Sequence, residues 1–236
     1  MDKVKEIAKM IDHSILNPVF TDEDLRINCE IAAKNHVASV CVKPYAVKQA
    51  FAYLKGTDVE IGCVIGFPHG NSSIAVKVFE AETACIDGAT EIDMVINIGK
   101  ALSGDWIYIE NEISDITKVC HKFKAIVKVI FETDYIKDTE DKIKLCEICT
   151  RAGADFVKTS TGFGFVKQPD GNYNYKGATV TDIELMRKHS GLKVQVKAAG
   201  GVRTLDDLLK VKEAGATRVG ATATEAILQE AVIRFR

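Results

Sequence analysis

Short apolar runs rich in β-branched residues recur along the chain, and most are followed by a segment with helical periodicity. Strands are predicted at 11–16, 37–43, 59–66, 91–98, 125–131, 155–160, 193–199 and 217–221. Amphipathic helices are predicted at 21–35, 72–87, 105–122, 138–152, 178–189 and 204–214. Thr21 and Thr204, each followed three residues later by an aspartate, are predicted helix N-caps.

This alternation predicts the fold class. Eight strands alternating with helices in 236 residues predict an α/β protein, a (β/α)8 TIM barrel. No linker or low-complexity segment interrupts the pattern, so one domain spanning 1–236 is expected. A doubly wound open sheet is the alternative, although no glycine-rich dinucleotide fingerprint follows the first strand.

Charge and composition exclude several function classes. A net charge of −2 gives no electrostatic reason to expect nucleic acid or an anionic membrane as a partner. No apolar stretch resembles a signal peptide or a membrane span, and the seven scattered cysteines fit a reducing compartment, so a soluble cytoplasmic protein is expected. Cys146 and Cys149 are interpreted as apolar side chains on one helix face, and neither a metal site nor a cofactor is predicted.

Four consecutive predicted strands each carry an ionisable residue inside an apolar run, namely Asp93, Lys128, Lys158 and Lys197. Because side chains alternate along a strand, all four can point into the barrel and meet near its mouth. Any single lysine could instead extend outward between helices. The repetition on adjacent strands favours a functional site.

Several clustered lysines suit one kind of chemistry. A free lysine has a pKa of about 10.4, so only roughly one in a few thousand is a neutral amine at pH 7. Burial and a neighbouring cation both lower that pKa, which prepares the amine to form a Schiff base with a carbonyl. A nearby carboxylate can then relay protons. The pattern predicts a metal-independent aldolase.

A second group of residues suits an anion. Gly200 and Gly201 precede a Thr-capped helix after the seventh strand, where barrels often bind phosphate, and Arg203 could add a charge. Gly220 and Thr222 follow the eighth strand.

Other polar candidates have simpler explanations. Cys41 could face the site from the second strand, although a small core side chain is the favoured interpretation. His13 and His69 are interpreted as satisfied polar residues near strand ends.

Seven blocks carry a resemblance to the 2-deoxyribose-5-phosphate aldolase family of class I aldolases: "IDHSIL", "SVCVKP", "IGFPHG", "EIDMVINIG", "KVIFET", "DFVKTSTGF" and "VKAAGGVRT". The resemblance implies that Lys158 forms the Schiff base, Lys197 lowers its pKa and Asp93 relays protons. It implies phosphate binding at Gly162, Gly200, Gly201, Arg203 and Gly220. Thr222, Lys128 and Cys41 complete the predicted substrate-binding set.

The resemblance also implies the reaction, which is reversible cleavage of 2-deoxy-D-ribose 5-phosphate to D-glyceraldehyde 3-phosphate and acetaldehyde. A homo-oligomer, dimer or tetramer, is expected on the same grounds. Alternatives are a Schiff-base aldolase for another sugar phosphate or aldehyde, a metal-dependent lyase or isomerase, and a non-catalytic binding protein.

Three features depart from the family pattern. Thr222 and Ala223 stand where relatives often carry paired serines, and the loop 162–177 is longer than a short glycine-rich link. The chain ends "AVIRFR", without the C-terminal tyrosine that some relatives bring to the active site. The loop is predicted either to act as a lid that selects the phosphate, with Lys167 and Lys176 as possible cations, or to be a surface insertion.

Overall fold

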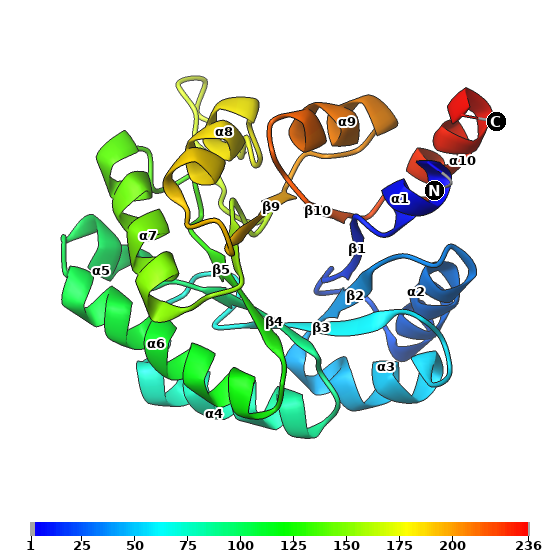
Figure 1. The fold of residues 1–236 in the computed structure, drawn as a ribbon, viewed down its shortest axis with the longest axis horizontal. Helices are drawn as coiled ribbons and strands as arrows, with labels where there is room; N and C mark the ends of the chain where they lie inside the picture. Colours follow the sequence, from blue (N-terminus) through cyan, green and yellow to red (C-terminus); the bar gives the residue numbers. More distant parts are fainter. Residues whose placement is uncertain (1–2, 236) are drawn as a thin grey trace.

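A computed structural model describes residues 3–235, in which eight parallel strands close into a barrel (Figure 1). The order around the barrel is β1, β10, β9, β6, β5, β4, β3, β2. The strands are β1 (Ile11–Ile15), β2 (Ser39–Val42), β3 (Glu60–Ile65), β4 (Glu91–Val95), β5 (Ile126–Ile130), β6 (Phe156–Lys158), β9 (Gln195–Ala199) and β10 (Arg218–Ala221). Because β1 pairs with both β2 and β10, the barrel prediction is confirmed and the open-sheet alternative is wrong.

Helices surround the barrel on its outer side (Figure 1). They are α1 (Lys3–Ala8), α2 (Asp22–Lys34), α3 (Val47–Leu54), α4 (Ile74–Ile86), α5 (Ile98–Leu102), α6 (Trp106–Lys122), α7 (Thr139–Ala152), α8 (Val180–His189), α9 (Leu205–Glu213) and α10 (Thr224–Phe235), with a 3-10 turn, η1 (Pro44–Ala46). Among the described residues, none of these helices has the length and apolar character needed to cross a membrane.

Local capping explains where several helices begin. Thr21 and Thr204 each accept a hydrogen bond from the aspartate N–H three residues on, and each aspartate side chain accepts from the threonine N–H. Both predicted N-caps are therefore confirmed. The predicted strand 91–98 ends early at Val95, because the Asn97 side chain accepts from the Lys100 N–H and starts the unpredicted helix α5.

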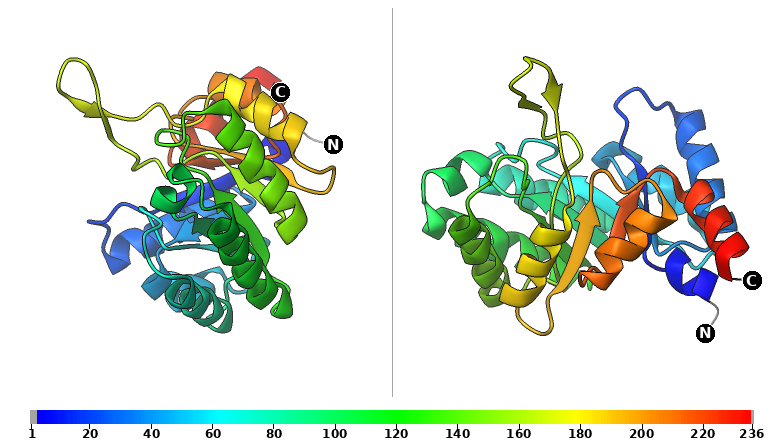
Figure 2. Two further views of the ribbon diagram at one scale, coloured as in Figure 1. Left: turned by 90° about the vertical axis from the view of Figure 1, so that its left-hand side faces the viewer. Right: turned by 90° about the horizontal axis from the view of Figure 1, so that it is seen from above.

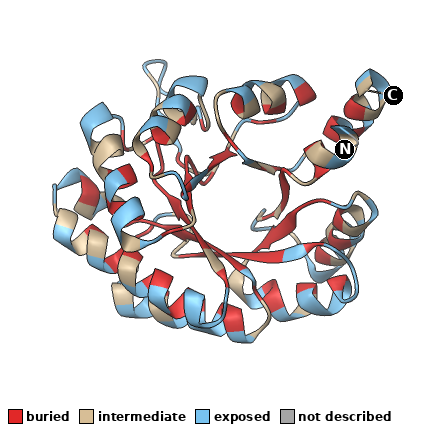
Figure 3. Ribbon diagram, viewed as in Figure 1, coloured by how far each residue is buried: buried red, intermediate tan, exposed pale blue. Residues whose placement is uncertain are grey.

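The apolar core fills the layer between the strands and the helices, where buried positions line the inner faces of the helices (Figure 3). Ile92 and Met94 of β4 belong to this layer, whereas Asp93 between them points to the barrel interior. Cys146 and Cys149 of α7 are buried in the same core, which confirms their interpretation as apolar side chains.

The long loop after β6 contains a two-stranded antiparallel hairpin, β7 (Val166–Lys167) and β8 (Tyr173–Asn174). In both views of Figure 2 this segment, drawn in yellow-green, projects away from the barrel. Its tip contains Pro169, Asp170 and Gly171, a combination typical of tight turns, and Gly171 has a φ of 86°. The hairpin therefore extends the chain outward beyond the carboxyl end of β6.

Candidate active site

The four ionisable residues predicted on adjacent strands all point into the barrel. Asp93 and Lys128 have no exposed surface, Lys197 is 1% exposed and Lys158 is 3% exposed. Strands β4, β5, β6 and β9, which carry them, are neighbours in the barrel. The structure therefore brings these side chains together as the strand alternation predicts.

Asp93 is the centre of this group. Its Oδ2 accepts hydrogen bonds from Lys158 Nζ at 2.7 Å and from Lys197 Nζ at 2.7 Å. Its Oδ1 lies 3.0 Å from Lys128 Nζ but accepts no hydrogen bond from the described residues. One oxygen thus holds two ammonium groups, and the other is buried beside a third, that of Lys128.

The surroundings shift the pKa values of Lys158 and Lys197 in opposite directions. Burial lowers the pKa of Lys158 and the charge of Lys197 lowers it further, against the opposing effect of Asp93. Burial also acts to lower the pKa of Lys197, but Asp12 and Asp93 together outweigh it, so that pKa is raised. Lys158 is therefore the lysine closer to the neutral amine, and Lys197 remains a cation.

The pKa of Asp93 is held well below its ordinary range. Burial alone would raise it, but Lys128, Lys158 and Lys197 reverse that effect. Asp93 is therefore ionised in the resting site.

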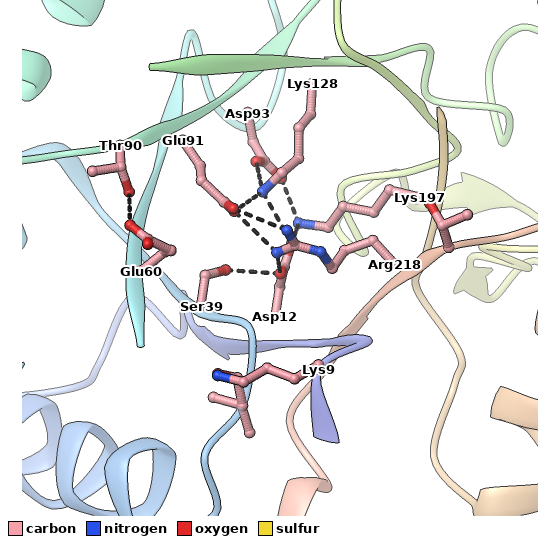
Figure 4. Close-up of polar contacts among 12 residues, drawn as sticks. Lys9, Asp12, Ser39, Glu60, Thr90, Glu91, Asp93, Lys128, Lys197 and Arg218 are labelled. Carbon is pink, nitrogen blue, oxygen red and sulfur yellow. Dashed lines mark hydrogen bonds and ion pairs between the residues drawn. The ribbon is translucent and has the colours of Figure 1, made fainter. Parts of the chain in front are cut away.

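Sequence reasoning missed part of this network, which includes Asp12 on β1, Glu91 on β4 and Arg218 on β10 (Figure 4). Asp12 Oδ2 lies 3.0 Å from Lys128 Nζ and also pairs with Lys197, while Arg218 pairs with Asp12 and, at 3.0 Å, with Glu91. Glu91 could have been predicted from the sequence, because it lies two residues before Asp93 and so shares its strand face.

Lys128 is part of this buried network of ion pairs and does not line the cavity described below. Its ammonium pairs with Asp12, Glu91 and Asp93, and its side chain is fully buried. Cys41 is also buried, and burial raises the pKa of its thiol to about 11, so it stays protonated at neutral pH.

Of the two histidines, His13 is confirmed as a satisfied polar residue. Its ring nitrogens bond Thr224 Oγ1 at 2.7 Å and Asn28 Oδ1 at 2.9 Å.

A cavity of about 500 Å³ lies beyond the carboxyl ends of β1, β6, β9 and β10. It is lined by all six residues predicted for phosphate, namely Gly162, Gly200, Gly201, Arg203, Gly220 and Thr222. Lys128 and Cys41 are not among its lining residues. A Cβ built on Gly220 would lie 3.6 Å from Lys197 Cε, so the cavity adjoins the lysine cluster.

The N-terminus of α9, which the sequence suggested as an anion site, is not part of this cavity. The N–H groups of Arg203 and Thr204 already donate to Asp207, and neither Thr204 nor Leu205 at the start of α9 is among the lining residues. Gly200 and Gly201, with φ of 83° and 84°, form the turn that faces the cavity. The candidate anion site is this turn rather than the helix end.

No group of three or more His, Cys, Asp or Glu side chains between residues 3 and 235 is arranged to hold a metal ion. The acidic side chains of the barrel interior, Asp12, Glu91 and Asp93, instead contact lysine and arginine.

Comparisons with known proteins show the family of the chain. A family model described as "DeoC/LacD family aldolase" matches residues 6–230. The chain is 49% identical over 226 residues to a deoxyribose-phosphate aldolase of Rhodopirellula baltica, covering 96% of this chain and 89% of the relative. It is 49% identical over 228 residues to one of Thermococcus gammatolerans, covering 96% of each chain.

Solved structures are similar as well. A putative deoxyribose-phosphate aldolase from Coccidioides immitis superimposes with a TM-score of 0.88 at 37% identity, covering 96% of this chain and 86% of that one. Deoxyribose phosphate aldolase from Aeropyrum pernix, described as having a unique tetrameric structure, has a TM-score of 0.85 at 30% identity, covering 96% of this chain and 91% of that one.

Proposed function

This chain belongs to the DeoC/LacD family of aldolases, and from that premise we propose that it cleaves 2-deoxy-D-ribose 5-phosphate reversibly to D-glyceraldehyde 3-phosphate and acetaldehyde. The reaction runs through a Schiff base on Lys158 and uses no metal. The observation that carries the proposal is the pair of lysines on one buried carboxylate oxygen, Lys158 and Lys197 on Asp93 Oδ2.

Each residue has a distinct role in this proposal. The lowered pKa of Lys158 increases its fraction of neutral, nucleophilic amine at neutral pH. Lys197, kept charged by Asp12 and Asp93, supplies the cation that disfavours protonation of Lys158. Asp93 offers Oδ1, which accepts no hydrogen bond from residues 3–235, as the acceptor for a proton carried by substrate or water.

The proposed cleavage begins at the aldehyde group of the open-chain sugar. The amine of Lys158 adds to the C1 aldehyde of the open-chain sugar, and loss of water leaves a protonated imine. When the C3 hydroxyl loses its proton to Asp93, directly or through water, the C2–C3 bond breaks and its electron pair moves into the imine as an enamine. Glyceraldehyde 3-phosphate leaves. Protonation of C2 and hydrolysis then release acetaldehyde and restore Lys158.

The phosphate is assigned to the cavity of about 500 Å³ that adjoins Lys197. Gly200, Gly201, Arg203 and Thr222 are among the residues that line it. Donors and a cation converging beside a lysine cluster favour a phosphorylated substrate over a neutral sugar.

Reductive trapping tests the proposal. Incubation with acetaldehyde and sodium borohydride should leave an ethyl group on Lys158, mapped by mass spectrometry of peptides. The Lys158→Arg variant should show no such adduct and no cleavage of deoxyribose 5-phosphate, while a metal chelator should not change the wild-type rate.

An adduct mapped to Lys197 or Lys128 would reverse the assigned roles. Trapping on Lys158 without cleavage of deoxyribose 5-phosphate would favour an aldolase for a different sugar phosphate or aldehyde.

We also propose a homo-oligomer in the cytoplasm. The Aeropyrum pernix relative is described as tetrameric. Several large apolar side chains of α4 are exposed, including Phe79 at 71% and Ile86 at 68%. Sedimentation analysis of the purified chain tests the assembly, and a monomer across a micromolar concentration range would contradict it.

A further inference from the structure

The returning arm of the hairpin lies directly against the glycine turn of the phosphate cavity. Ala178 N–H donates to the Gly200 carbonyl at 3.0 Å. A Cβ on Gly177 would lie 2.4 Å from the Gly200 oxygen, and one on Gly200 would lie 3.0 Å from Gly177 Cα. The two backbones are therefore packed so closely that neither position accepts a side chain.

Residues that follow β5 hold both arms of the hairpin in place. The Asp134 carboxylate accepts from the N–H groups of Lys176 at 2.6 Å and Gly177 at 3.0 Å. On the outgoing arm, the Tyr135 hydroxyl donates to the Phe165 carbonyl at 3.2 Å. The base of the hairpin is thus fixed relative to the barrel.

This arrangement brings one hairpin side chain into the cavity. Tyr175 lines the cavity, and its Cε2 lies 3.5 Å from the position of a Cβ on Gly200. Phe165 packs edge-to-face on the ring, with centroids 5.3 Å apart. The hairpin cations Lys167 and Lys176 are exposed and do not line the cavity.

We propose that Tyr175 is a specificity-determining residue, whose ring closes one wall of the phosphate subsite and whose hydroxyl donates a hydrogen bond to a phosphoryl oxygen. The inference rests on the proposed function, since it assigns the phosphate to this cavity. A phenolic hydroxyl is a donor, and donation to a charged oxygen is among the stronger hydrogen bonds. The hairpin thereby supplies a donor to the same cavity that Thr222 lines.

Tyr175→Phe tests the hydroxyl while keeping the ring and its contact with Phe165. We expect kcat/KM for deoxyribose 5-phosphate to fall about tenfold or more, because a hydrogen bond to a charged group is lost, and kcat/KM for unphosphorylated deoxyribose to change less than twofold. Tyr173→Phe is the matched control, since Tyr173 is on the same hairpin, is 65% exposed and does not line the cavity, and it should change neither value.

Two outcomes would overturn the inference. One is a Tyr175→Phe enzyme whose preference for the phosphate ester stays within twofold of wild type. The other is an equal loss in Tyr173→Phe. If wild type cleaves neither substrate, the proposed function fails separately, and calorimetric titration with inorganic phosphate then decides the inference. Weaker phosphate binding by Tyr175→Phe than by wild type supports it, and equal binding contradicts it.

Discussion

Two chemically identical side chains, those of Lys158 and Lys197, share one carboxylate oxygen but differ in their other partners. Among residues 3–235, Lys158 pairs with one carboxylate, that of Asp93, whereas Lys197 pairs with both Asp93 and Asp12. The second carboxylate is what keeps the pKa of Lys197 raised while that of Lys158 is lowered. The assignment of nucleophile and cation thus depends on Asp12, a residue of the first strand.

The role of Lys197 is tested by Lys197→Leu. Removing this cation raises the pKa of Lys158, because the charge of Lys197 contributes to its lowering and Asp93 then has one lysine fewer to balance. The neutral amine becomes scarcer at pH 7, by about tenfold for each unit of pKa. We expect kcat/KM to fall by about a hundredfold or more near pH 7 and to recover partly as the pH approaches the new pKa of Lys158.

The measurement is a profile of kcat/KM between about pH 6 and pH 10. Lys142→Leu is the control, since Lys142 pairs with Asp182 outside the barrel interior and should leave the profile unchanged. A Lys197→Leu enzyme with near-normal activity at pH 7 would rule out electrostatic activation.

Glu132, just after β5, is another buried acid, and it was not among the predicted site residues. It is 1% exposed, has a φ of 57° and accepts from the N–H and hydroxyl of Thr161. Burial raises its pKa to about 7, although Thr161 acts in the opposite direction. Relative to the unfolded chain, the folded protein therefore favours the protonated, neutral form of the Glu132 carboxyl.

This shift predicts a pH dependence of stability. A folded pKa of about 7 above the ordinary 4.5 means that the contribution of Glu132 is complete below about pH 4.5 and is lost as pH rises through about 7. Relative to Glu132→Gln, wild type should lose about 3 kcal/mol of unfolding free energy between about pH 5 and pH 8. Urea denaturation at several pH values checks this, and parallel curves for the two proteins would contradict it.

At the scale of elements, regular patterns were predictable and interruptions were not. The eight barrel strands and both Thr caps follow from local sequence. Helix α5 was missed because its apolar residues continue the run of β4, and only the Asn97 cap separates the two. The hairpin was also missed, although "PDG" at 169–171 is a turn signal between two short aromatic segments.

The same distinction holds for the site. The inward positions of Asp93 and the lysines were predictable because side chains alternate along each strand, and the cavity residues because they lie at or just after strand ends. Asp12 and Arg218 were missed because their partners lie on other strands, up to 206 positions away in the chain. Such contacts depend on the register of the closed barrel, which no local pattern encodes.

For the whole molecule, these long-range ion pairs tie the two ends of the chain together. The barrel closes where β1 meets β10, and α1 packs beside α10 at the same place (Figure 1). Arg218 on β10 pairs with Asp12 on β1 and reaches Glu91 on β4 across the interior. Its side chain is 15% exposed and both carboxylate partners are almost fully buried. The point where the barrel closes therefore carries charges that have little access to water.

Arg218→Met should consequently destabilise the whole fold. Removing the guanidinium leaves Asp12 and Glu91 short of a buried partner, and breaking such a pair costs about 3–5 kcal/mol of unfolding free energy. Arg234→Met is the matched control, because Arg234 also pairs with two carboxylates, Asp206 and Glu230, but at the surface, where the loss should be below about 1 kcal/mol. Urea denaturation of both variants at neutral pH measures the difference. Equal losses would mean that the interior pairs contribute no more than surface ones, and that the backbone pairing of β1 with β10 and the apolar packing are enough to hold the two ends of the chain together.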